Sequence, residues 1–568
     1  MEHTLIILCE LDIPPAVLTA GGLDNYRAIT FDPVLLDLMQ DSGLENVEYV
    51  DFEDCPAFPD LHNDSRELSL AVERELFAAI AEFLPGVSNF AWQHLVFYFF
   101  FNANHWYRAL AAYLASNAAR ILGTTMPTIF VNDNPSLFFW PSFVPSIAML
   151  EVFQAKGIAF KAISYEERAD ESDVLPMLIK FDDDAPETWD ILVHLPTCLH
   201  DESFLQSELA ASGKSVINLR PKYWDVSLPA DKDVCLVRCE SVIPRLPPAL
   251  QAALATMTTR LTARIGDLLA PYISTDSYRQ RQIRHLVSLY RSQLLTYFLL
   301  HDFFAERKPR KMMLTDHDAG FHGPLTAYAE VAKIPVLLFP HSKTTADIQF
   351  SRTAVHCLTH PMQGDQINDA DGQRVICHKI AFPEHMSGAT GLPGPIKRIG
   401  LLLNSISLNG VLNSAHKPYM AGVRLIVEWC RKRDIELVVR GRHGFTLISM
   451  LAEATGIAAS TLREVMYMPL SSFVAGQDLC LMYDAPTTAA LEFLRNSVPI
   501  LNPTPEPLAK YEAVIANTAI IPRGTVEQIL FSLDSLVADP ENLRIFRLGQ
   551  FANYVNSFRD SHTLRVLM

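Results

Sequence analysis

The stretch that decides the fold is KMMLTDHDAGFHGPLTAYAEVAKIPVLLFPH, residues 311–341. An apolar run ends abruptly at Asp316, apolar residues at helical spacing follow, and a second apolar run ends at His341. Two buried strands joined by a helix form a β-α-β unit, in which the strands are parallel and helices cover the sheet. This stretch therefore predicts a parallel sheet with titratable side chains at the ends of two strands.

The same alternation recurs along the chain. The segment 128–164 repeats the order of strand, Asp-bearing loop, helix, Lys-Gly-Ile break and strand. Further apolar runs that we expect to be strands lie at residues 4–11, 190–195, 214–219, 398–405, 435–441, 478–484 and 498–502. Near-continuous apolar strands alternating with helices are typical of parallel sheets, so α/β is the predicted fold class.

The length of 568 residues exceeds what one hydrophobic core usually serves and predicts at least two domains. The best boundary is GATGLPGPIKR, residues 388–398, which concentrates Gly and Pro before a fresh strand. We therefore predict an N-terminal domain over 1–390 and a C-terminal domain from 396. Within the first, residues 247–307 indicate a helical insertion with a break near PYISTDS.

Composition excludes several classes of protein. A net charge of −17 provides no basic footprint for nucleic acid. Nine scattered cysteines without a CxxC pair fit a reducing compartment and imply no zinc site. The N-terminus lacks the features of a signal peptide, and polar residues interrupt the apolar stretch 95–115, which we expect to be a buried helix. We predict a cytoplasmic protein without a transmembrane segment, and peripheral membrane association stays open.

Ligands of open parallel sheets bind outside the carboxyl ends of the strands. The polar residues that follow the predicted strands are Asp133, Asp316, His317, Asp318, His341, Ser342, Asn404, Ser405, Arg440, Arg442, His443, Tyr483 and Asp484. The two arginines and His443 surround Gly441, and such a loop suits bidentate phosphate binding, with a solvated basic loop as the alternative. The absence of GxGxxG and GxxxxGK[ST] argues against the usual dinucleotide fold and a P-loop NTPase.

The stretch YDAPTTAALEF, residues 483–493, offers a second anion site. Thr487 and Thr488 open a helix that Thr488 can cap, and a helix N-terminus attracts anions. Glu492 lies four residues later on the same face, where a carboxylate could bind ribose hydroxyls. The alternative is a capped helix with a surface glutamate, just as Asp316 could simply cap the helix that follows it.

Four segments, taken in their order along the chain, resemble GT-B-fold glycosyltransferases. The resemblance is greatest to the bacterial surface-polysaccharide kind, which builds capsule or lipopolysaccharide with Kdo- or sialic-type sugars. They are LTDHDAGFHGPLTAYAEVAKIPVLLFPHSK (314–343), IELVVRGRHGF (435–445), LMYDAPTTAALEFLRNSVPIL (481–501) and the closing segment 513–555. The resemblance implies two Rossmann-like domains facing a cleft. The acceptor would bind the domain 1–390 and the donor the domain 396–540, and the segment 541–568 would supply a helix that crosses back. It also implies no metal and no cofactor.

The resemblance assigns roles to the residues at the strand ends. Asp316 is the first candidate for the catalytic base or for a carboxylate against the anomeric carbon, with His317 and Asp318 in reserve. His341 would contact the donor or the reacting centre. The donor-binding residues would be Ser342, Asn404, Ser405, Arg440, Arg442, His443, Tyr483, Thr487, Thr488 and Glu492.

The predicted function is transfer of a sugar from a nucleotide-sugar donor, such as a CMP- or UDP-sugar, to a glycan, a lipid-linked acceptor or a protein. A CMP-activated acidic sugar is attractive because the basic groups at the strand ends would meet its carboxylate. Two alternatives stay open: polyol-phosphate transfer from a CDP-polyol, and a non-catalytic scaffold or binding module of the same fold.

Overall fold

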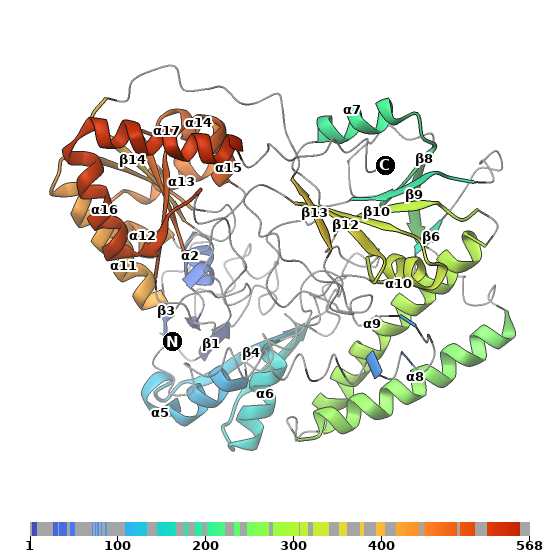
Figure 1. Cartoon of the computed structure of the whole chain (residues 1–568). Helices are drawn as coiled ribbons and strands as arrows, with labels where there is room; N and C mark the ends of the chain where they lie inside the picture. The colour runs from blue at the N-terminus through green and yellow to red at the C-terminus, as the bar shows by residue number, and fades with distance from the viewer. Residues whose placement is uncertain are drawn as a thin grey trace.

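A computed structural model gives the fold of the chain (Figure 1). It describes residues 3–7, 26–31, 33–41, 46–50, parts of 71–87, 108–132, 145–165, 177–179, 188–195, 202–221, 232–238, 247–271, 276–305, 307–315, 322–339, 352–359, 375–379, 394–403, 416–441, 448–484, 489–505, 520–556 and 568. The strands of these residues form three sheets, and neighbouring strands run parallel except for one antiparallel pair. The predicted α/β class is confirmed.

The first sheet has the strand order β3-β2-β1-β4-β5, and every pair is parallel. Its strands are β1 (His3–Ile7), β2 (Tyr26–Thr30), β3 (Val47–Tyr49), β4 (Met126–Asn132) and β5 (Lys161–Tyr165), with helices α2 (Pro33–Asp41), α5 (Ala118–Ile121) and α6 (Pro145–Ala155). This is the order of the first five strands of a Rossmann-like sheet, in which the direction of winding reverses between β1 and β4.

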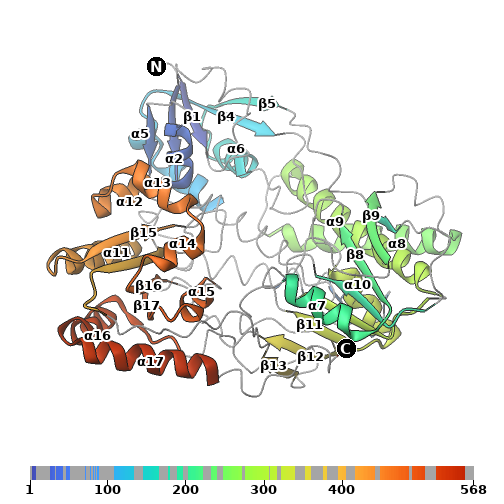
Figure 2. The ribbon, with the colours of Figure 1, turned by 90° about the horizontal axis from the view of Figure 1, so that it is seen from above.

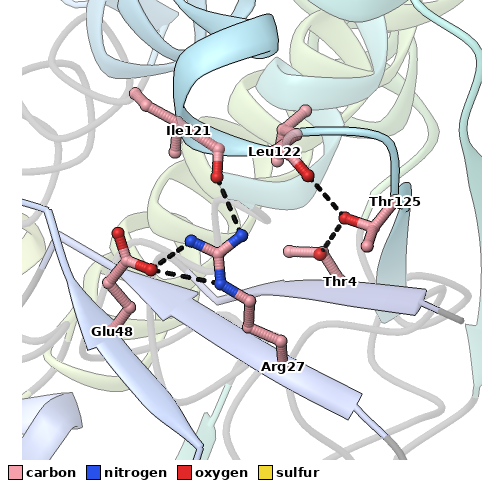
Figure 3. A network of polar contacts seen from close by, with 6 residues as sticks. All are labelled: Thr4, Arg27, Glu48, Ile121, Leu122 and Thr125. Carbon is pink, nitrogen blue, oxygen red and sulfur yellow. Dashed lines mark hydrogen bonds and ion pairs between the residues drawn. The ribbon is translucent and has the colours of Figure 1, made fainter. Parts of the chain in front are cut away.

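A polar network ties the amino edge of the first sheet together (Figure 3). Arg27 of β2 donates to the carbonyl of Ile121 at 2.9 Å and pairs with Glu48 of β3. The hydroxyl of Thr125 donates to the carbonyl of Leu122 at 2.7 Å and contacts the hydroxyl of Thr4 in β1. The network joins three strands to the turn before β4, so it stabilises the edge opposite to the one where ligands bind such sheets.

The second sheet has eight strands in the order β13-β12-β11-β10-β7-β8-β9-β6. They are β6 (Met177–Ile179), β7 (Ile191–His194), β8 (Val216–Pro221), β9 (Lys232–Arg238), β10 (Lys311–Thr315), β11 (Val336–Phe339), β12 (Ala354–Thr359) and β13 (Ile376–Lys379). Alternate residues face opposite sides: Val193 and Met313 share one apolar cluster with α7 (Glu202–Ser212), whereas Leu192 and Met312 lie in the cluster that includes α9 (Asp276–Phe303). Both faces are therefore covered, as a parallel sheet requires.

A helical pair makes the long crossover of the second sheet. Helix α8 (Pro248–Leu269) and helix α9 carry the chain from β9 to β10, on the other side of β7. The two helices occupy the predicted insertion, with the predicted break between them. Helix α9 ends against α10 (His322–Ala332), where Phe304 stacks on Tyr328 at 5.2 Å between ring centroids. This crossover creates the reversal of winding between β7 and β10.

The third sheet, in the C-terminal part, has the order β15-β14-β16-β17-β18 and is parallel throughout. Its strands are β14 (Arg398–Leu403), β15 (Glu436–Arg440), β16 (Leu479–Tyr483), β17 (Ile500–Thr504) and β18 (Arg523–Thr525). Its helices are α11 (His416–Arg431), α12 (Ile448–Thr455), α13 (Ala459–Tyr467), α14 (Leu470–Ala475), α15 (Ala490–Arg495), α16 (Val526–Ala538) and α17 (Pro540–Asn556). Helices α11 and α16 share one apolar cluster with the sheet, α14 and α15 share the other, and α17 contributes to both.

The predicted strands are confirmed, and one N-terminal domain over 1–390 stays a prediction. The structure divides this range into two sheets, which sequence analysis did not predict. The reason is that periodicity identifies strands without saying which of them pair. Figures 1 and 2 place the second sheet on one side of the molecule and the third on the other, with the first beside the third. Met568 lies against the second sheet, where Lys311 Nζ donates to its carbonyl at 3.3 Å. The chain thus returns there after α17, although residues 557–567 lie outside the described part.

The described part of the apolar stretch 95–115 is helical from residue 108, and Leu110, Ala111 and Leu114 are buried. Among the helices of the described residues, none combines the length and apolarity that a membrane crossing needs. Cys430 and Cys480 are buried thiols of the third sheet's core, and burial raises the pKa of Cys430 to about 12. They therefore serve as small core residues.

We expect Gly422→Ala to destabilise the third sheet by about 1–3 kcal/mol, because overpacking forces neighbouring side chains off their positions. A Cβ at Gly422 would lie 2.1 Å from the Tyr483 hydroxyl and 3.0 Å from Val526. The measurement is the thermal unfolding midpoint. The control is Gly549→Ala in α17, where a Cβ meets nothing within 4 Å and alanine favours the helix. Equal midpoints for the two variants would contradict the packing described here.

Candidate functional site

The carboxyl edge of the third sheet is the best-described candidate site. From β14 the chain winds first to β15 on one side and then to β16 on the other, so the winding reverses between β14 and β16. Ligands of doubly wound sheets bind at such a reversal, outside the carboxyl ends of the two strands. Strand β14 ends at Leu403, and β16 ends at Tyr483.

Tyr483, predicted to bind the donor, has its hydroxyl in the core. It donates to the carbonyl of Tyr419 in α11 at 2.7 Å, and the two rings pack edge to face with centroids 4.6 Å apart. Burial, followed by the charges of Asp484 and Glu527, raises the pKa of Tyr483. The phenol therefore stays protonated and holds α11 to the sheet, away from any ligand at the strand end.

Asp484 follows Tyr483 and was left out of the predicted site. Its backbone is left-handed, with a φ of 71°, and its side chain is buried. The N–H of Asp484 donates to the carbonyl of Pro503 at 3.0 Å, and the amide of Asn502 donates to the Asp484 carbonyl at 2.8 Å. These bonds hold the backbone of Asp484 in place, so a buried carboxylate lies beside the reversal of winding. The sequence signal was its position directly after a strand.

Arg440, predicted to bind phosphate, caps a helix. Its guanidinium donates to the carbonyl of Val465 at 2.8 Å and to that of Met468, which end α13, and it lies over the ring of Phe473 at 5.6 Å. Carbonyls at a helix C-terminus lack partners within the helix and attract cations. Burial lowers the pKa of Arg440. These contacts account for Arg440 without a ligand, so a phosphate at this edge would depend on other groups.

Glu492 interacts within its own helix. Its Oε1 accepts from the amide of Asn496 at 3.2 Å, and its carboxylate lies 4.0 Å from Arg495. Helix α15 begins at Ala490 with Ala489 at its N-cap, so the prediction that Thr488 caps it is wrong by one residue.

Most of the predicted site residues lie outside the described residues. They are Asp316, His317, Asp318, His341, Ser342, Asn404, Ser405, Arg442, His443, Thr487 and Thr488. The strands that precede several of them are described, and they end at Thr315, Phe339, Leu403 and Arg440. The roles of these residues therefore stay predictions.

The second sheet has its own reversal of winding, between β7 and β10. Asp316 follows β10, so the predicted catalytic cluster is attached to one of the two strands at this reversal. His194 ends the other strand, is fully buried, and has its Nδ1 2.8 Å from the carbonyl of Leu219. Since a carbonyl only accepts, Nδ1 carries a proton. Sequence analysis missed His194, which is the polar residue near the end of the apolar run 190–195.

The first and third sheets meet at their carboxyl edges. Tyr49 ends β3, and its hydroxyl lies 3.4 Å from Nδ1 of His416, which starts α11. Asp37 of α2 accepts from the N–H of Ser449 at 3.0 Å and from its hydroxyl, at the start of α12. Asp37, from a helix of the first sheet, thereby caps α12 of the third sheet. Both views show α2 beside α12 (Figures 1 and 2).

No protein-family model matches the chain, and a search of curated proteins found no match. Similar solved structures include the glycosyltransferase SnogD from Streptomyces nogalater, 14% identical over 67% of this chain and 97% of that one, with a TM-score of 0.34. Another is α,α-trehalose 6-phosphate synthase from Burkholderia multivorans, which is 10% identical over 65% of this chain and 95% of that one, with a TM-score of 0.37. A third is UDP-GlcNAc 2-epimerase from Neisseria meningitidis bound to UDP-GlcNAc. It is 11% identical over 65% of this chain and 98% of that one, with a TM-score of 0.31. Because these TM-scores are below 0.5, the functional proposal rests on the residues of this chain.

We expect Asp37→Ala to lower the stability of the contact between the first and third sheets, because removing a helix cap costs about 0.5–2 kcal/mol. The measurement is a double-mutant cycle of thermal unfolding with Ser449→Ala. A shared contact predicts that the double variant loses less than the sum of the two single losses. The control is Glu453→Ala, on the exposed face of α12, which should leave stability nearly unchanged. Additive losses would rule out the hydrogen bond between the Ser449 hydroxyl and Asp37.

His416 should make the protein sensitive to acid. Burial lowers the pKa of His416 to about 3, whereas an unfolded histidine titrates near 6.5. As the pH falls from about 6.5 towards 3, the unfolded state binds a proton that the folded state does not, so stability decreases. Urea midpoints of His416→Gln should therefore fall less between pH 7 and pH 5 than those of the wild type. His301→Gln, on the exposed end of α9, should keep the wild-type dependence, and an unchanged slope in His416→Gln would refute the expectation.

Proposed function

We propose that this protein is a glycosyltransferase that moves a sugar from a nucleotide-sugar donor to a glycan, a lipid-linked acceptor or a protein. The observation that carries the proposal is the meeting of two parallel sheets at their carboxyl edges, through Tyr49 with His416 and Asp37 with Ser449. Such edges are where doubly wound sheets bind nucleotides, and a transferase needs one site for the donor and one for the acceptor. The four segments that resemble GT-B enzymes add to this support.

The donor would bind at the third sheet, at the reversal of winding between β14 and β16. Arg442 and His443 follow β15 and would neutralise the phosphates, since Arg440 is engaged at the end of α13. Asn404, Ser405, Thr487 and Thr488 would supply hydrogen bonds to the nucleotide. A CMP-activated acidic sugar remains the preferred donor, because its carboxylate would add to the negative charge that these basic groups attract.

The transfer step needs a base for the acceptor hydroxyl and stabilisation of the departing phosphate. Asp316 follows β10 of the second sheet and is proposed as the base or as the carboxylate against the anomeric carbon, with His317, Asp318 and His341 as its neighbours. This role requires the carboxyl end of β10 to reach the donor at the third sheet. The O–H bond of the acceptor breaks as its oxygen attacks the anomeric carbon, and the bond from that carbon to phosphate breaks. No metal or cofactor takes part in this scheme. The cytoplasmic location expected from the cysteine pattern stays a prediction.

The first test is a thermal-shift screen with CMP, CDP, UDP and GDP, because a ligand that binds only the folded state raises the unfolding midpoint. We expect at least one nucleotide to stabilise the wild type and Arg442→Ala to lose most of that shift. Arg440→Ala is the contrasting variant: it should unfold at a lower temperature and keep its nucleotide-dependent shift. Asp316→Asn should bind the nucleotide and lose transfer to acceptor. A wild type that binds no nucleotide and no nucleotide sugar would favour a non-catalytic module instead.

A further inference from the structure

Left-handed backbone in residues other than glycine marks four places among the described residues: Lys333, Asp434, Asp484 and Ser497. Three of them end helices, and the residue after each closes the helix with a hydrogen bond to the carbonyl five positions earlier. These bonds join Ile334 to Ala329 at 2.8 Å, Ile435 to Cys430 at 3.1 Å and Val498 to Phe493 at 2.9 Å. This is an ordinary way for a helix to end, and it implies no function.

Asp484 is different because it follows a strand. It takes a φ of 71° directly after β16, at the carboxyl edge where the winding reverses. A left-handed residue with a side chain is unfavourable, and it persists where the surrounding structure holds it, commonly at a binding site. Here the N–H of Asp484 is bound by the carbonyl of Pro503 in β17.

Asn502 of β17 holds the bend from the other side. Its amide nitrogen donates to the carbonyls of Met482 and Asp484, the two residues that flank Tyr483. Asn502 is 1% exposed, and no described residue donates a hydrogen bond to its Oδ1. A buried acceptor without a donor is costly and points to a partner that binds at the site.

We propose that Asp484 binds the hydroxyl groups of the nucleotide-sugar donor and that Asn502 is the residue that positions it. This inference rests on the proposed function and deepens it. A carboxylate accepts hydrogen bonds from hydroxyls and repels phosphate, so Asp484 faces the ribose or the transferred sugar, while phosphate binds the basic loop. Asn502 donates to the carbonyls of Met482 and Asp484 and so fixes the backbone that carries the carboxylate before the ligand arrives, which lowers the entropy cost of binding.

The test measures the affinity of the nucleotide that stabilises the wild type most, among CMP, CDP, UDP and GDP, and of a nucleotide sugar that carries the same nucleotide. Asp484→Asn keeps the shape and removes the charge, and Asp484→Gly removes the side chain and relieves the left-handed backbone. We expect both variants to bind at least about tenfold more weakly, because hydrogen bonds to charged groups are the stronger ones. Asp484→Gly should nevertheless unfold at or above the wild-type temperature. This pairing of weaker binding with kept stability separates a binding role from a structural one.

The matched controls are Asp434→Asn and Asp434→Gly, which change the same residue type in the same backbone conformation at the end of α11. They should leave both affinities unchanged. For Asn502, the isosteric change Asn502→Asp sets a carboxylate against two carbonyls and should weaken binding. The double variant Asp484→Asn, Asn502→Asp should bind no more weakly than whichever of the two single variants binds more weakly. Additive losses would show that Asn502 acts separately and would overturn its positioning role.

The outcomes also show which part of the ligand Asp484 contacts, and they distinguish failure of this inference from failure of the proposed function. Weaker binding of both the nucleotide and the nucleotide sugar assigns Asp484 to the ribose, and weaker binding of the nucleotide sugar alone assigns it to the transferred sugar. If the wild type binds a nucleotide and both Asp484 variants bind nucleotide and nucleotide sugar as tightly, this inference is wrong and the proposed function stands. If the wild type binds neither kind of ligand, the proposed function fails and this inference with it.

Discussion

The structure depends on one constraint: parallel strands need crossover connections. Each crossover returns the chain to the same end of the sheet, so the carboxyl ends of all parallel strands collect at one edge. Where successive crossovers go in opposite directions, two strands separate at that edge and leave the backbone there open to a ligand. The chain meets this constraint in each of its three sheets, with reversals at β1 and β4, at β7 and β10, and at β14 and β16.

The constraint also explains where polar contacts occur between units. At the amino edge of the first sheet, Arg27, Glu48 and Thr125 join strands of the same unit (Figure 3). At its carboxyl edge, Tyr49 and Asp37 reach residues that start α11 and α12 of the third sheet. Helix N-termini lie at the carboxyl edge in these folds and present unpaired N–H groups, so a carboxylate from a neighbouring unit is a favourable partner for them.

Sequence analysis predicted the strands of the candidate site better than the directions of their side chains. Arg440 and Tyr483 were chosen because they end strands, and both do so, but one caps α13 and the other packs beneath α11. Successive residues of a strand point to opposite faces, and a shift of one residue moves a side chain from the ligand edge into the core. Asp484 and His194 show the reverse case: Asp484 was listed at a strand end but given no role, and His194, which ends a strand, was not named.

The sequence by itself determined the α/β class, the positions of eleven strands, the helical pair after residue 247 and the presence of polar residues at strand ends, because these follow from local periodicity and turn residues. The tertiary structure alone decided that 1–390 forms two sheets, that the first sheet meets the third, and that Asp484 is held left-handed by Asn502. These features depend on which strands pair and on contacts between residues far apart in the chain. Local sequence carries the preference for a strand or a helix, and only long-range packing selects its neighbours.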